Sequence, residues 1–188
     1  MIGILVLGIV VAVLAWAVII YNGLVQLRVR SENAWSDIDV QLKRRHDLVP
    51  NIVAAVEGYA THERATLQSV IEARTRAMDT TKVADKGQME SSLTSTLRSL
   101  FAVAERYPDL KANEHFLRLQ TDLVEIEETI QAARRYYNAV VRDLNTLIQM
   151  FPSSLVAGVC NVRPRDFFQL SAPELERQAP QVKIDVQQ

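Results

Sequence analysis

The sequence predicts an all-α protein, in which an N-terminal transmembrane helix runs into an antiparallel up-and-down helical bundle. The first observation behind this is an uncharged apolar block over residues 2–21, and the second is that Gly and Pro number only six each in 188 residues. The third is an apolar stripe from Phe116 to Phe151 whose steps alternate between three and four residues, the spacing of coiled-coil packing. Its members are Phe116, Leu119, Leu123, Ile126, Ile130, Ala133, Tyr137, Val140, Leu144, Leu147 and Phe151. Such a helix is about 55 Å long and needs other helices to cover its stripe.

The apolar block predicts a transmembrane anchor over residues 1–23. Residues 2–21 contain no charged side chain, and about 20 such residues in a helix span the 30 Å hydrocarbon core of a bilayer. We therefore expect residues 2–21 to contact lipid. A cleaved signal peptide is the alternative, since Ala15-Trp16-Ala17 offers a small-x-small triplet. It is less favoured, because no basic residue precedes the run and the run continues past the triplet.

Basic residues follow the anchor and do not precede it. Arg28 and Arg30 come first, and Lys43, Arg44 and Arg45 come next. The positive-inside rule then predicts that the N-terminus lies outside and the bundle lies in the cytoplasm.

The expected bundle, residues 24–152, begins as a direct continuation of the anchor. Apolar residues keep a helical spacing from Leu24 to Val49 with no turn signal between them. Pro50 removes one backbone donor, but the stripe resumes directly after it, which favours a kink inside one long helix over a chain reversal. We expect Asn51 to satisfy carbonyls that the proline frees. The first reversal is predicted at residues 78–87, where polar turn residues cluster.

A short helix and a long helix are expected to complete the bundle. The short one ends at Tyr107 because Pro108 cannot continue it, and Asn113 can cap the long helix. The prediction is thus a long helix, a short helix and a long helix, or four helical segments if the kink at Pro50 counts as a break. Short connections between them imply antiparallel neighbours.

For residues 153–188 we predict a C-terminal extension of short helical or irregular segments. We expect residues 178–188 to be a frayed tail. Four apolar residues of the extension can pack against the end of the bundle: Leu155, Val156, Phe167 and Phe168.

The composition gives no sign of catalysis. The net charge of −1 does not suggest a nucleic-acid partner. Di-iron bundles need Glu-x-x-His, and no glutamate lies three residues before His46, His62 or His115. The lone Cys160 has no metal-ligand spacing, and we interpret the acidic cluster around Glu127 (Glu125, Glu127 and Glu128) as a solvated helix face. We therefore predict a protein that is not an enzyme and has no cofactor or metal.

Two groups of residues stand out from generic helix. The five cations Arg28, Arg30, Lys43, Arg44 and Arg45 are candidate contacts for anionic lipid or a partner protein. The last three lie about 30 Å beyond the anchor, farther than a Debye length, so a solvated face or ion pairs with Asp39 and Asp47 is the favoured alternative.

The second group has an expected structural role. It consists of Trp35, Pro50, Asn51, Tyr137 and Asn138. Tyr137 lies on the apolar stripe, and a buried hydroxyl needs a hydrogen-bond partner, for which Asn51 or Arg45 is expected.

Several longer motifs together resemble the LemA family of bacterial membrane proteins, over residues 21–168. They are Asn33-Ala34-Trp35-Ser36, Ile38-Asp39-Val40-Gln41-Leu42-Lys43-Arg44-Arg45, Asp47-Leu48-Val49-Pro50-Asn51, Gly58-Tyr59-Ala60, His62-Glu63, Ala73-Arg74, Ala104-Glu105-Arg106-Tyr107-Pro108-Asp109-Leu110-Lys111-Ala112-Asn113, Phe116-Leu117, Ala133-Arg134-Arg135-Tyr136-Tyr137-Asn138, Phe151-Pro152 and Arg163-Pro164-Arg165-Asp166-Phe167-Phe168. Cys160 is not part of the pattern. The resemblance implies a membrane anchor followed by an antiparallel helical bundle at the bacterial cytoplasmic (inner) membrane. It implies no established enzymatic activity. Family members are often found beside membrane peptidases or TPM-domain proteins, and one branch is associated with magnetosome membranes.

Two hypotheses about function follow. The first is a single-pass membrane protein that acts as a helical scaffold and self-assembles into a homo-oligomer, organising or shaping the membrane. The second is an adaptor or sensor for a partner membrane protein such as a membrane peptidase, with Lys43, Arg44 and Arg45 as its docking surface.

Overall fold

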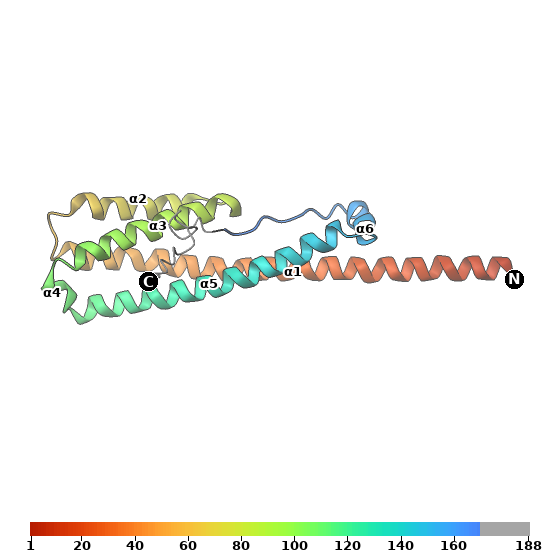
Figure 1. Cartoon of the computed structure of the whole chain (residues 1–188), viewed down its shortest axis with the longest axis horizontal. Helices are drawn as coiled ribbons and strands as arrows, with labels where there is room; N and C mark the ends of the chain where they lie inside the picture. The colour runs from red at the N-terminus through yellow and green to blue at the C-terminus, as the bar shows by residue number, and fades with distance from the viewer. Residues whose placement is uncertain (170–188) are drawn as a thin grey trace, which may run out of the picture.

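The computed structural model describes residues 1–169, and over that range its regular structure is entirely helical. The elements are α1 (Ile2–Glu57), α2 (Arg64–Asp79), α3 (Val83–Ala104), α4 (Pro108–Lys111), α5 (Glu114–Gln149) and α6 (Ser153–Val159). Figure 1 shows α1, α2, α3 and α5 lying alongside one another as an up-and-down bundle, which confirms the predicted fold class. The tail expected at residues 178–188 lies outside the described residues.

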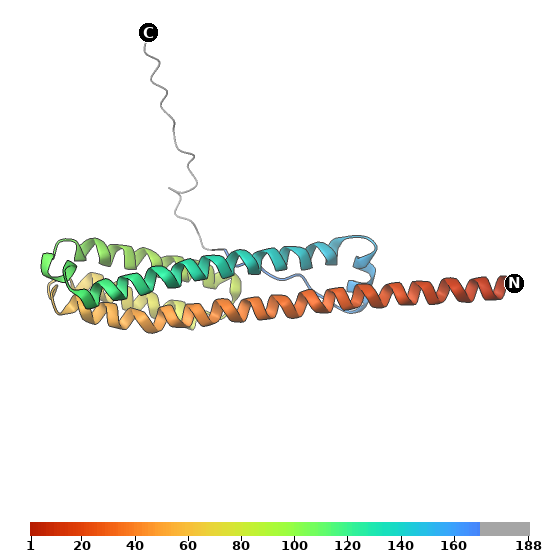
Figure 2. The ribbon, with the colours of Figure 1, turned by 90° about the horizontal axis from the view of Figure 1, so that it is seen from below.

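Helix α1 is a single element of 56 residues. Its first part extends alone beyond the bundle (Figures 1 and 2), and its side chains there are exposed. Within the described residues, α1 is the helix that is long and apolar enough to cross a membrane. The second part of α1 is buried at Leu24, Ala34, Ile38 and Leu42, because its apolar stripe there faces α5.

The first chain reversal comes earlier than predicted. Helix α1 ends at Glu57, and residues 58–63 turn the chain so that α2 runs back along it. Ala60 is buried in this turn, and the amides of Tyr59 and Ala60 both donate to the carbonyl of Val56. Apolar residues continue at helical spacing on both sides, so the stripe hides the break. The predicted turn at residues 78–87 is present but shorter, and Gly87 lies inside α3.

Pro50 lies inside α1, and the helix passes through it without a break. A proline at position 50 leaves the carbonyl of His46, four residues earlier, without its helical donor. The expectation that Asn51 satisfies such a carbonyl is wrong. Nε of Arg74, on α2, donates to the His46 carbonyl at 2.6 Å, and Asn51 is exposed.

Among residues 1–169, the buried apolar side chains of the bundle form three clusters spaced along its length. The distal cluster joins the end of α1 to α2, α3, α4 and the start of α5. The middle cluster joins α1 to α5 around Ile38, Ile130 and Tyr137. The proximal cluster brings together Leu24 of α1, Leu144 of α5 and Ala157 of α6.

The long C-terminal helix matches its prediction closely. Asn113 is its N-cap, and its side chain accepts from the amide of Phe116 at 3.0 Å. Most stripe residues from Phe116 to Leu144 are buried. Phe151 is exposed because α5 ends at Gln149, two residues before it.

Beyond α6 the chain turns at residues 160–161 and runs back along the bundle as an extended segment, residues 162–169, seen in Figure 1 beside α5. Phe168 is fully buried, but in the middle cluster and not at the end of the bundle. Val156 packs against the proximal cluster as expected. Leu155 and Phe167 are exposed, which corrects the expectation that they pack.

Candidate functional site

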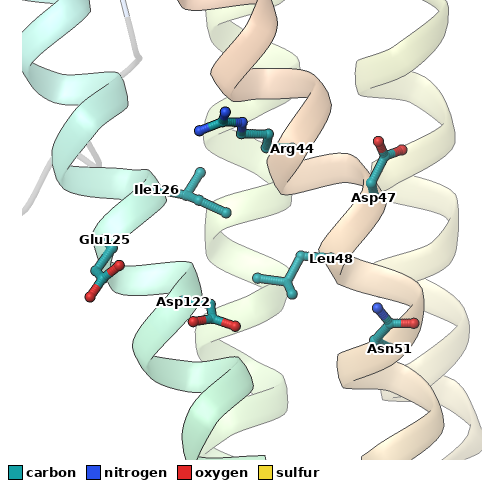
Figure 3. A pocket seen from close by; sticks show the side chains of 7 residues that line it. All are labelled: Arg44, Asp47, Leu48, Asn51, Asp122, Glu125 and Ile126. Carbon is teal, nitrogen blue, oxygen red and sulfur yellow. The ribbon is translucent and has the colours of Figure 1, made fainter.

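A groove of about 490 Å³ lies between α1 and α5, in the distal half of the bundle. Figure 3 shows Leu48 and Ile126 in the gap between the two helices, with charged side chains around them. The lining residues are Arg44, Asp47, Leu48 and Asn51 from α1, and Asp122, Glu125 and Ile126 from α5. The groove thus has an apolar floor and a rim with three carboxylates and one guanidinium. Such a rim suits a segment that carries positive charge.

One rim carboxylate is already paired. Nζ of Lys43 donates to Asp47 at 2.7 Å. This hydrogen bond, with the positive charges of Lys43 and Arg74, lowers the pKa of Asp47. Asp47 is one of the two ion-pair partners that the sequence predicts. Asp39 pairs instead with Lys86 of α3, at 3.4 Å.

The predicted cationic docking surface does not exist as three adjacent charges. Lys43 is exposed and paired, Arg44 is exposed at the groove, and Arg45 is fully buried. Consecutive helical residues point about 100° apart, so a run of three cannot share one face. Nearer the anchor, Arg28 pairs with Glu32 at 3.3 Å and Arg30 is exposed.

Arg45 lies at the centre of a buried ionic cluster between α1, α3 and α5. Its guanidinium is 3.0 Å from a carboxylate oxygen of Glu127 and 3.7 Å from one of Glu90. Nη2 donates to the hydroxyl of Thr94 at 2.8 Å and to the Glu90 carbonyl at 3.2 Å. Nε2 of His46 lies 2.9 Å from the other oxygen of Glu90. One guanidinium therefore balances two carboxylates in the interior of the bundle.

The cluster corrects two interpretations. Arg45 is no surface contact, and Glu127 is not part of a solvated face, since its side chain is only 26% exposed. Burial raises the pKa of Glu127 despite the opposing charge of Arg45. The sequence does not indicate that Glu90 belongs to this buried ionic cluster. Glu90 sits beside Met89 in a polar stretch, and nothing local distinguishes a buried carboxylate from an exposed one.

Trp35, Tyr137 and Asn138 meet at the extended segment. The ring of Trp35 lies 5.5 Å from those of both Tyr137 and Phe168. The Tyr137 hydroxyl donates to the carbonyl of Asp166 at 2.9 Å, not to Asn51 or Arg45 as expected. Burial raises the pKa of this hydroxyl. Pro50 and Asn51 lie apart, in the distal half of the bundle.

Asn138 and Asn145 hold the same extended segment by its backbone. The side-chain amide of Asn138 donates to the carbonyl of Phe168 and accepts from its amide, each at 3.0 Å. Asn145 makes the same pair of bonds with Arg165, each at 2.9 Å. Two asparagines seven residues apart share a helix face. That spacing was the available signal for Asn145, which the sequence reading missed.

Comparison with known proteins gives these residues a family context. The model of the LemA family matches residues 34–184. Protein LemA of Metamycoplasma hominis is 30% identical over 78% of this chain, and the match spans 66% of that relative's length. Magnetosome protein MamQ 2 of Paramagnetospirillum magneticum is 24% identical over 85% of this chain and 68% of its own. Magnetosome protein MamQ of Magnetospirillum gryphiswaldense is 22% identical over 79% of this chain and 64% of its own.

The chain thus spans about two thirds of the length of these relatives. The matched region begins at Ala34, beside Trp35, and includes the buried ionic cluster, the groove and the segment held by Asn138 and Asn145. Because the family model covers most of the sequence, the chain belongs to the LemA family.

Proposed function

We propose that this protein is a non-enzymatic, single-pass membrane protein that self-assembles through its helices into a scaffold at the bacterial cytoplasmic membrane. The observation that carries the proposal is the continuity of α1. One helix includes the candidate membrane span and eleven buried positions of the bundle, from Leu24 to Val56. No loop separates the two parts. A helix without a break transmits the position of one end to the other, so the anchor fixes the bundle in place over the membrane.

The relatives and the charge pattern support a membrane role. Three relatives are named as magnetosome proteins, which favours a function in organising or shaping a membrane. Arg28 and Arg30 follow the span closely, and this favours an N-terminus outside and a bundle in the cytoplasm. A reporter active only in the cytoplasm, fused after Gln188, tests the orientation. Activity supports it, and activity of a periplasm-specific reporter instead rejects it.

A stripe of small residues supports self-assembly in the bilayer plane. Gly8, Ala12 and Ala15 lie at positions i, i+4 and i+7 of α1, hence on one face. Nothing in the bundle lies within 4 Å of a Cβ placed at Gly8. Transmembrane helices associate through such faces because small side chains let the backbones approach closely.

Native mass spectrometry of the protein in nanodiscs tests the assembly. We expect oligomers for the wild type and a shift to monomer for the double variant Gly8→Leu and Ala12→Leu. The matched control, Val10→Leu and Val13→Leu, enlarges side chains on the opposite face and should leave the oligomer intact. Monomers alone for the wild type, at every protein-to-lipid ratio, would reject self-assembly.

The groove favours a second candidate function, an adaptor for a partner membrane protein such as a peptidase. Its acidic rim suits a basic partner segment, so Asp122 and Glu125 replace the predicted cationic stretch as the docking residues. In native membranes, Asp122→Lys with Glu125→Lys should abolish co-purification of a specific membrane protein. The control Glu114→Lys, on the same helix but outside the groove, should not. Equal recovery with both variants would reject the groove as the docking site.

A further inference from the structure

Helix α6 lies beside α1 at the point where α1 leaves the bundle (Figure 1). One face of α6 is part of the proximal core cluster: Ala157 is buried there with Leu24, and Val156 packs on the same cluster as Ile20. Leu27 belongs to the same cluster, so α6 packs beside residues 20–27 of α1, from the end of the apolar block onward.

The opposite face of α6 is apolar and uncovered. Leu155 is 62% exposed and Val159 is 89% exposed, and Phe151, just before the helix, is 78% exposed. Leu155 and Val159 lie four residues apart within α6, so they share one face, and Phe151 lies two residues before the helix begins. Met150, at the end of α5, is also exposed. Large exposed apolar patches of this kind mark an interaction surface.

The height of this face along α1 identifies what covers it. If residues 2–21 fill the hydrocarbon core of about 30 Å, Ile20 and Tyr21 lie at its boundary. Because α6 packs at that level, its uncovered face lies where headgroups meet acyl chains. Short amphipathic helices bind bilayers with their apolar face at this depth.

We propose that α6 is an interfacial foot, whose Leu155–Val159 face inserts into the bilayer surface, with Phe151 just before it, beside the transmembrane part of α1. This inference rests on the proposed membrane span of α1, but not on self-assembly. The foot adds a second point of attachment away from the axis of α1. Two attachments fix the tilt of the rod and its rotation about α1, which a single helix leaves free.

An arginine-lined cavity next to α6 supplies the polar half of the same surface. It has a volume of about 280 Å³ and is lined by Arg28, Arg163 and Arg165, together with Asn161. Glu32 pairs with Arg28 and Arg165, while Nε of Arg163 donates to the side-chain oxygen of Asn161 at 3.5 Å. Guanidinium groups bind phosphate in a forked geometry. Arg28 lies about 10 Å beyond Tyr21 along the helix, within reach of headgroups for a long side chain. The foot should therefore favour anionic lipid.

The depth of α6 is measurable because Cys160, directly after the helix, is exposed and is the single cysteine of the chain. The full-length protein in lipid vesicles is labelled there with an environment-sensitive fluorophore and tested with quencher-bearing lipids and with iodide. Reference probes at Val10→Cys and Thr61→Cys, each with Cys160→Ser, report the membrane span and the distal turn.

We expect Cys160 to be quenched by lipids that carry the quencher near the headgroup, and Thr61→Cys by iodide alone. A Cys160 probe as open to iodide as the Thr61→Cys probe, with the Val10→Cys probe protected, would overturn the foot and leave the span intact. An unprotected Val10→Cys probe would overturn the span itself.

Charge substitutions test the surface and its lipid preference. Leu155→Glu with Val159→Glu should abolish lipid quenching at Cys160 while the circular dichroism of the protein stays helical. The control Leu117→Glu with Val124→Glu changes two exposed apolar residues of α5, on the distal half, and should leave the quenching at Cys160 unchanged.

Quenching should be stronger in vesicles containing phosphatidylglycerol than in phosphatidylcholine alone, and Arg28→Gln with Arg163→Gln should remove the difference. Unchanged quenching in the Leu155→Glu, Val159→Glu variant would reject the foot. Free phosphate should compete with the headgroup in the wild type and have no effect in the arginine variant. If quenching does not depend on lipid charge, or if free phosphate does not compete in the wild type, the arginine cavity is rejected as a headgroup site.

Discussion

At the scale of single residues, α1 depends on a side chain from another helix for its continuity. Pro50 leaves the carbonyl of His46 without a backbone donor, and Arg74 replaces that donor. An unsatisfied, partly buried carbonyl costs about 1–3 kcal/mol. Arg74 therefore compensates for the proline and at the same time joins α2 to α1.

The pairing of Arg74 with Pro50 can be tested by a double-mutant cycle. Arg74→Met should destabilise the wild type by about 1–3 kcal/mol. In the Pro50→Ala background residue 50 regains an amide for His46, so the same substitution should cost about 1 kcal/mol less. Urea unfolding measures both. Arg76→Met, an exposed arginine of α2, is the control, and an equal cost of Arg74→Met in both backgrounds would contradict the pairing.

Arg45 gives a second prediction at this scale. Its removal leaves the buried Glu90 without its cation, and breaking a buried ion pair costs about 3–5 kcal/mol. We expect Arg45→Met to cost that much in urea unfolding. Arg44→Met, one residue earlier and exposed, should stay within about 0.5 kcal/mol of wild type. Similar costs for the two variants would show that the cluster does not stabilise the bundle.

The raised pKa of Glu127 predicts a dependence on pH. A carboxyl group whose pKa is higher in the folded than in the unfolded state binds its proton more tightly when folded. Its contribution to stability therefore falls as pH rises from its ordinary pKa through the raised one. The stability of wild type relative to Glu127→Gln should decline over that interval in urea unfolding at successive pH values. A difference that grows with pH would mean that the ion pair with Arg45 outweighs burial.

At the scale of elements, the extended segment 162–169 acts as a strap across α1 and α5. Asn138 and Asn145 bond its backbone, and Phe168 fills the middle cluster. Gly87 makes room for it, because a Cβ there would clash with the backbone carbonyl of Gln169. The glycine is thus a close-approach residue and not a turn residue.

Loss of one asparagine should loosen the strap without unfolding the bundle. Asn138→Leu removes both hydrogen bonds to Phe168, at a cost of about 1–3 kcal/mol. Hydrogen exchange should accelerate at residues 163–169, while the amides of α2 and α3 keep their protection. Asn51→Leu, at an exposed asparagine, is the control. Unchanged exchange in Asn138→Leu would mean that the aromatic contacts alone hold the strap.

At the scale of the whole molecule, the core clusters leave the first part of α1 uncovered. The distal and middle clusters draw on residues 34–168 only. Removal of residues 1–23 should therefore leave a folded bundle that no longer requires detergent. Its far-ultraviolet circular dichroism should stay helical, and its urea transition should stay cooperative. A non-cooperative transition would show that the bundle needs its anchor to fold.

How much the sequence reveals differs from element to element. The long C-terminal helix and its Asn113 cap were predicted correctly, because an apolar stripe and a cap are both local signals. The reversal at residues 58–63 was missed, because apolar spacing continues across it. Lys43–Asp47 was predicted because the two lie one helical turn apart. The partners of Arg45 and Tyr137 were not, because Glu90, Glu127 and Asp166 are distant in sequence.

The sequence by itself determined the all-α class, the apolar helix able to span a membrane, the capped stripe of α5 and the resemblance to the LemA family. These features depend on periodicity, composition and motifs, which are properties of neighbouring residues. Only the tertiary structure decided that Arg45 is buried and that Arg74 donates to the carbonyl that Pro50 leaves without a donor. It also decided that Asn138 and Asn145 hydrogen-bond the backbone of the strap. Each of these depends on which helix faces are brought together, and a one-dimensional pattern does not record which face meets which partner.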